Sequence, residues 1–113
     1  MLLIEKEFRK GILFVRLKGR LTREEVPYLN MEVTRLIEDI GIHNVVFNIS
    51  NINDIDMEGV NVLLYNYNLC RNNDGISMLC GVNSEISEYI NHSSISNMFQ
   101  IKDEISAMNM IEI

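Results

Sequence analysis

Residues 52–60, with the sequence INDIDMEGV, are predicted to close a polar connection and open an amphipathic helix. Asp56 is a favourable N-cap for that helix, because its carboxylate can accept a hydrogen bond from a first-turn backbone N–H. The helix is predicted to end at residues 72–75, where Asn, Asn, Asp and Gly follow one another. Between these limits apolar residues recur at helical spacing, at Val60, Leu63, Leu64 and Tyr67.

A compact run rich in β-branched and aromatic residues, Val45-Val46-Phe47-Asn48-Ile49, precedes this stretch. Apolar residues at successive positions are typical of a strand that is buried on both faces, so this strand is predicted to lie inside a sheet. Residues 50–55 are predicted to form a polar loop between the strand and the helix that begins near Asp56.

The N-terminal part of the chain predicts a β-hairpin followed by a helix. Residues 2–8 and 11–17 are the two strands, with a turn at residues 9–11. Thr22 and Glu25 have the spacing of a capping box, but a helix starting there would place Pro27 at an unfavourable interior position. The helix is therefore predicted to begin near Glu25 and to end at Gly41. Its apolar face carries Val26, Leu29, Val33, Leu36, Ile37 and Ile40.

The remaining segments alternate between strands and helices. Residues 76–82 predict a strand, Ser84 the cap of a short third helix, Met98–Ile101 a brief strand, and Asp103 the start of a last helix. This order predicts an α/β fold with a four- to five-stranded mixed sheet, an N-terminal hairpin and about four helices. The 113 residues are expected to form a single domain, residues 1–113.

Composition limits the classes of function. The net charge of −6 disfavours binding to nucleic acid or to an anionic membrane surface, and it suits a basic protein partner. Cys70 and Cys80 are too few for a disulfide framework or a zinc site. The apolar start is too short for a signal peptide and no stretch could cross a bilayer, so a cytoplasmic location is expected. No glycine-rich phosphate loop occurs, and neither a cofactor nor a metal is expected.

The order of elements and several motifs together resemble the STAS domain family, which includes the bacterial anti-sigma factor antagonists. The resemblance covers essentially the whole chain. It rests on Gly19-Arg20-Leu21-Thr22, Val26-Pro27-Tyr28-Leu29, Val45–Ile49, Ser93-Ser94-Ile95 and Asp103-Glu104. The strongest piece is residues 52–60, which stand where the family carries an Asp-Ser-Ser-Gly or Asp-Ser-Thr-Gly loop; here the sequence is Asp56-Met57-Glu58-Gly59.

The resemblance implies a non-enzymatic protein-binding regulator, an anti-anti-sigma factor that docks this loop and the following helix on an anti-sigma kinase. In the antagonists the loop holds the phosphorylated serine or threonine, and by position that phosphoacceptor falls on Glu58. The alternative is a STAS subunit or scaffold of another complex, such as a lipid-transport ABC system or a stress-signalling assembly. A homodimer remains open. The implied partner-binding residues are Thr22, Asn53, Asp56, Met57, Glu58, Gly59 and Val60.

Two interpretations of the loop stay open from the sequence. Glu58 is either an ordinary acid in the first turn of a helix or a permanent, partial imitation of phosphoserine. Met57 either forms a contact surface or folds back under the helix. Asp56 and Glu58 together could perform acid–base chemistry, but no neighbouring group completes an active site, so catalysis is disfavoured.

Overall fold

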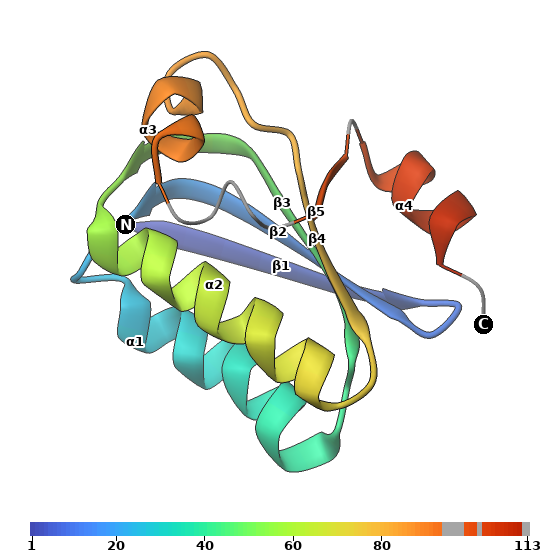
Figure 1. The fold of residues 1–113 in the computed structure, drawn as a ribbon. Coiled ribbons are helices and arrows are strands. Elements are labelled where there is room, and N and C mark those ends of the chain that lie inside the picture. The colour runs from blue at the N-terminus through green and yellow to red at the C-terminus, as the bar shows by residue number, and fades with distance from the viewer. Residues whose placement is uncertain (94–98, 102, 112–113) are drawn as a thin grey trace.

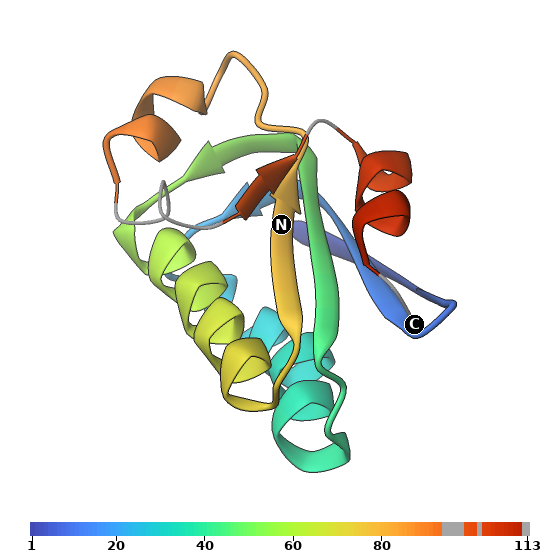
Figure 2. The same cartoon turned by 45° about the vertical axis from the view of Figure 1, so that its right-hand side comes forward.

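The computed structural model describes residues 1–93, 99–101 and 103–111 and contains a five-stranded sheet with helices on both faces (Figures 1 and 2). The strand order is β1-β2-β3-β4-β5; the first pair is antiparallel and the others are parallel. The strands are β1 Leu2–Arg9, β2 Ile12–Leu21, β3 Asn44–Ile55, β4 Ile76–Cys80 and β5 Phe99–Ile101. The mixed sheet with an N-terminal hairpin is thus confirmed.

The helices divide between the two faces of the sheet. A first helical run, α1 with η1 and η2, lies beside α2 on one face, and α4 lies on the other (Figures 1 and 2). The bounds are α1 Val26–Leu29, η1 Asn30–Thr34, η2 Leu36–Ile40, α2 Met57–Asn72, α3 Ser87–Asn91 and α4 Glu104–Met110.

Strand β3 is the middle strand and is buried on both faces, as predicted. Val45, Phe47 and Ile49 belong to the larger core cluster, which also contains residues of α1 and α2. Val46 points to the opposite face, into the smaller cluster with Ala107 of α4. All four β3 residues have 0% exposure, so this strand anchors both layers of the core.

The prediction of a loop at residues 50–55 is wrong, because β3 continues to Ile55. This extension pairs with the end of β2 as far as Leu21, and that pairing satisfies its backbone groups. Ile52 and Ile55 are buried in the larger cluster, while the residues between them are exposed. Ile52 pairs with Gly19 and Asp54 with Arg20, so Asn53 is the extra residue of a β-bulge.

The first helix begins and ends as predicted. Glu25 is the N-cap of α1, Pro27 lies in the first turn, and Gly41 ends the helical run with a φ of +84°. Ile40, expected on the apolar face, is 69% exposed at the end of the helix.

The expected cap of the third helix at Ser84 is also wrong. Helix α3 begins at Ser87 with Ile86 at its N-cap position, and no side chain caps it. The side-chain oxygen of Asn83 accepts hydrogen bonds from the N–H groups of Glu85 and Ile86, at 2.9 and 3.3 Å, in the turn that precedes α3. Asp103 caps α4 as predicted, since its carboxylate accepts from the N–H of Ser106 at 2.9 Å. Ser94, Ile95 and Met98 lie outside the described residues.

Helix α4 is attached to the sheet by an ion-pair network around Arg16 of β2. The guanidinium donates to both carboxylate oxygens of Glu104, at 2.9 and 2.8 Å, and also to Glu5 and Glu7 of β1. Asn48 of β3 donates to Glu104 at 2.8 Å. The hydrogen bonds from Arg16 hold the pKa of Glu104 below its usual 4.5, even though partial burial opposes this shift.

Glu104→Gln is expected to lower the stability of the domain by about 1 kcal/mol at pH 7, because a neutral amide forms weaker hydrogen bonds with Arg16. A carboxyl whose pKa is lowered on folding stabilises the protein fully above its unfolded value of about 4.5. That contribution is lost as the pH falls below 4.5 and through the folded pKa. The difference between the two proteins should therefore shrink in urea titrations at pH 3.5. Asp39→Asn, at an exposed ion pair, is the control. A Glu104→Gln deficit that stays constant with pH would contradict this role.

Candidate functional site

The candidate site begins at Asp56, whose carboxylate joins the starts of two helices. Its Oδ1 accepts from the N–H of Gly59 at 2.9 Å, which confirms Asp56 as the N-cap of α2. Its Oδ2 accepts from the N–H of Arg23 at 2.9 Å, just before α1. The N–H of Asp56 donates to the carbonyl of Leu21 at 3.4 Å. Asp56 therefore fixes the loop against the connection between β2 and α1.

Gly59 allows the first turn of α2 to lie directly against the backbone at the end of β2. A Cβ at this position would stand 2.0 Å from the carbonyl oxygen of Leu21 and 3.0 Å from Cγ1 of Ile55. No real side chain tolerates the first of these distances, so only glycine fits here without a shift of the helix. The Asp-x-x-Gly spacing thus has two structural causes: Asp56 caps α2, and Gly59 allows the helix to lie against β2.

The two residues between Asp56 and Gly59 are the ones that face solvent. Met57 is 63% exposed, so its side chain does not fold back under the helix. Glu58 is also exposed, and its carboxylate has no hydrogen bond or ion pair with any described residue. It lies in the first turn of α2, where the free N–H groups favour a negative charge. Val60, which follows, is buried with 2% exposure.

Thr22 does not reach the surface, because it is 7% exposed and serves as an internal support. Its hydroxyl donates to Oε1 of Glu25 at 2.5 Å, and its N–H donates to the same oxygen at 3.2 Å. The bond from the Thr22 hydroxyl holds the pKa of the Glu25 carboxyl below its ordinary value, against the effect of burial. The side chain of Glu25 therefore makes the contact of a capping box, although α1 starts after it.

Asn53, the bulge residue of β3, is exposed, two positions before the strand ends. The structure thus sorts the predicted residues into three groups. Asn53, Met57 and Glu58 present side chains to solvent, Asp56 is half-buried, and the others are buried. The buried ones are Thr22, Gly59 and Val60.

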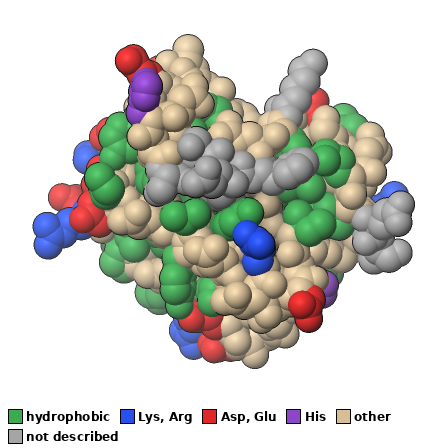
Figure 3. Space-filling view, in the orientation of Figure 1, with side chains coloured by type: hydrophobic (Ala, Val, Ile, Leu, Met, Phe, Trp, Pro, Cys, Tyr) green, Lys and Arg blue, Asp and Glu red, His purple; other side chains and the backbone are tan. Residues whose placement is uncertain are grey.

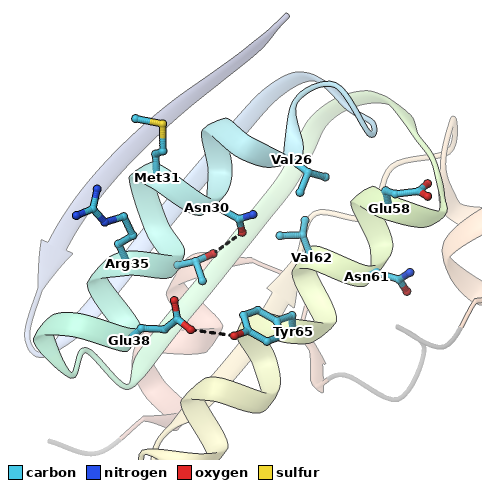
Figure 4. Close-up of a pocket in the computed structure, with 10 residues that line it drawn as sticks. Val26, Asn30, Met31, Arg35, Glu38, Glu58, Asn61, Val62 and Tyr65 are labelled. Carbon is cyan, nitrogen blue, oxygen red and sulfur yellow. Dashed lines mark hydrogen bonds between the residues drawn. The ribbon is translucent and has the colours of Figure 1, made fainter.

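Glu58 also stands at one end of an open groove between α2 and the first helical run, with a volume of about 590 Å³ (Figure 4). Val26 and Val62 point toward one another across it. Farther along, the hydroxyl of Tyr65 donates to Glu38 at 2.8 Å, and this bond raises the pKa of Tyr65. Sequence patterns did not reveal this groove, because it depends on how two helices pack. The one local indication of the groove in the sequence is Tyr65, an amphipathic residue beside the apolar face of α2.

The described part of the chain contains no cluster of three or more His, Cys, Asp and Glu residues that could hold a metal ion. No helix among those residues is long and apolar enough to cross a membrane. Both carboxylate oxygens of Asp56 accept hydrogen bonds from backbone N–H groups. These bonds give the side chain a structural role, and no catalytic role is needed to explain it.

Comparison with known proteins assigns the family. A family model described as the STAS domain matches residues 4–108. The chain belongs to the STAS domain family. Among curated relatives, it is 27% identical over 111 residues to the anti-sigma F factor antagonist of Paenibacillus polymyxa, covering 97% of this chain and 95% of that protein.

Solved structures show that this STAS domain shares its fold with anti-sigma factor antagonists. An antagonist from Mycobacterium paratuberculosis superposes with a TM-score of 0.83 at 14% identity, over 96% of this chain and 92% of that one. The antagonist SpoIIAA in its unphosphorylated form superposes with a TM-score of 0.75 at 14% identity, over 96% and 100% of the two chains. The fold predicted from the resemblance is therefore confirmed.

Proposed function

We propose that this STAS domain is a non-enzymatic anti-sigma factor antagonist that binds an anti-sigma factor kinase through the loop at Asp56–Gly59 and helix α2. The observation that carries the proposal is the exposed pair Met57 and Glu58 on a loop that Asp56 and Gly59 hold in place. A loop whose backbone is already held by hydrogen bonds loses little backbone conformational entropy when it binds a partner. The name of the Paenibacillus polymyxa relative supports the choice of partner.

Glu58 distinguishes this domain from antagonists that are switched by phosphorylation. By its position in the family loop it replaces the phosphoacceptor, and a carboxylate offers no hydroxyl to phosphorylate. Its single charge and two oxygens only partly imitate a phosphate, which has nearly two charges and three oxygens. The domain would thus carry a fixed charge at the position where related domains carry a switchable one.

A second candidate function is that of a STAS subunit or scaffold in another assembly, such as a lipid-transport ABC system or a stress-signalling complex. The observation in its favour is the same residue, Glu58, because such a role does not require phosphorylation at this position. In that case the exposed carboxylate would pair with a basic group of a different partner.

Titration calorimetry with each purified anti-sigma factor of the source organism tests the proposal. At least one is expected to bind with a Kd in the micromolar range or tighter, which corresponds to a binding free energy of about −8 kcal/mol or more favourable. Met57→Glu should weaken that complex by at least about tenfold, since it replaces an exposed apolar contact with a charge. Ile105→Glu, at a site 70% exposed on α4 across the sheet, is the matched control and should have no effect. If no anti-sigma factor binds, the proposal is wrong, and the second candidate function, a subunit or scaffold of another assembly, is favoured.

A further inference from the structure

A notch lies between the start of α2 and helix α3, next to the candidate loop, and has a volume of about 620 Å³. The first turn of α2 contributes to both hollows, because it supplies Met57 and Val60 to the notch and Glu58 to the groove. Its principal lining residues are Met57, Val60, Glu85, Glu88, Tyr89 and His92.

The notch has apolar walls. Met57 and Tyr89 are 63% and 42% exposed, which is high for large apolar side chains, and Val60, which also lines the notch, is buried. Exposed methionine and tyrosine side chains are typical of protein-binding surfaces, because both present large apolar area with a flexible or amphipathic tip. This surface is therefore suited to receive one large apolar side chain.

The rim of the notch is acidic. Glu85 and Glu88 are exposed, and neither carboxylate has a hydrogen bond or ion pair with any described residue. No lysine or arginine is among the described residues that line the notch, and His92 is the one basic side chain there. Figure 3 shows acidic and histidine side chains beside hydrophobic ones at the upper left, over the position of α3 in Figure 1. Phosphate groups of nucleic acid or lipid would be repelled here.

We infer that the notch receives a basic segment of the partner, in which one large apolar side chain inserts between Met57 and Tyr89 while flanking Lys or Arg residues meet Glu85 and Glu88. This inference rests on the proposed function and deepens it, because it extends the interface from the loop to α3. Unpaired carboxylates around an apolar anchor site match the usual anatomy of a specific interface, with an apolar centre and a charged rim.

The first test uses a short synthetic peptide with a central Phe flanked by Arg residues, titrated into the ¹⁵N-labelled domain. The amide shifts should concentrate at Met57, Val60, Glu85, Glu88 and Tyr89, and a twin peptide with Glu in place of Arg should cause none. Glu85→Gln with Glu88→Gln should weaken binding at least about fivefold, and more at low salt than at high salt. The control removes two exposed charges elsewhere, by Glu24→Gln with Asp74→Asn.

The inference is overturned if the shifts lie elsewhere, or if the control pair weakens the peptide complex as much as the pair in α3. The same variants titrated against the anti-sigma factor separate the two proposals. If that factor binds the wild type and the Glu85→Gln, Glu88→Gln variant equally, the notch is not part of the interface although the proposed function stands. If the peptide binds at the notch but no anti-sigma factor binds the domain, the proposed function fails while the chemistry of the notch holds.

Discussion

Gly59→Ala is expected to destabilise the domain by roughly 3 kcal/mol, at the upper end of what overpacking costs. The new Cβ would meet the carbonyl oxygen of Leu21 at 2.0 Å, and that oxygen belongs to backbone that cannot move aside as a flexible side chain can. Leu21 also accepts the N–H of Asp56, so a shift of α2 disturbs the N-cap as well. Urea unfolding followed by circular dichroism measures the loss.

Gly41→Ala is the matched control for this prediction. A Cβ at Gly41 would have no neighbour within 4 Å, but the φ of +84° at this position strains any other residue. Alanine there should cost about 1 kcal/mol through the backbone alone. If Gly59→Ala costs no more than Gly41→Ala, the close approach of α2 to β2 is not what selects glycine in the loop.

The parts of the fold that the sequence predicted are those with a strong local cause. Val45, Val46 and Phe47 are apolar at successive positions, a pattern that is typical of a strand covered on both faces. Asp56 and Asp103 each stand one residue before a helix and cap it through their own carboxylates. These causes act within a few residues, so no knowledge of distant neighbours was needed.

The errors have non-local causes. The polar segment 50–55 becomes a strand because the end of β2 pairs with it, and β2 lies some thirty residues earlier in the chain. Its alternation, with Ile52 and Ile55 inward, is broken by the bulge at Asn53 and therefore has no clean period of two. Before α3 the chain forms a turn at residues 84–86, which the side chain of Asn83 holds, so Ser84 lies in that turn and does not cap the helix.

The sequence predicted the order of the residues in the candidate site, but it did not predict which of their side chains are exposed. The family loop gives the order Asp56, Met57, Glu58 and Gly59, but it does not indicate whether Met57 faces solvent, which the structure shows at 63% exposure. The resemblance places Thr22 among the binding residues, whereas the structure buries its side chain and bonds the hydroxyl to Glu25. The notch at α3 was missed because its two walls come from segments about thirty residues apart.

Glu58→Ser is expected to turn a loop that cannot be phosphorylated into a substrate of the anti-sigma kinase. Serine places a hydroxyl on an exposed first turn beside Asp56, where the carboxylate offers no nucleophile. Incubation of each protein with the kinase and labelled ATP measures the difference: label should enter the variant and be absent from the wild type. Asn61→Ser, exposed one turn later on α2, is the control for hydroxyls near the loop. Equal labelling of the wild type would show that Glu58 is not at the phosphoacceptor position.

Glu58→Ala then decides what the carboxylate does in binding. If Glu58 imitates phosphoserine, removal of its charge relieves repulsion in the kinase pocket, and a gain of about 1.4 kcal/mol tightens binding roughly tenfold. If Glu58 instead pairs with a basic group of a different partner, the same change must weaken binding, so the sign separates the two candidate functions. Calorimetry at two salt concentrations isolates the charge effect, because salt screens exposed charges. Glu24→Ala, an exposed acid before α1, corrects for the change in net charge. Equal affinity of wild type and Glu58→Ala would contradict both interpretations and leave Glu58 as an acid that only stabilises the start of α2.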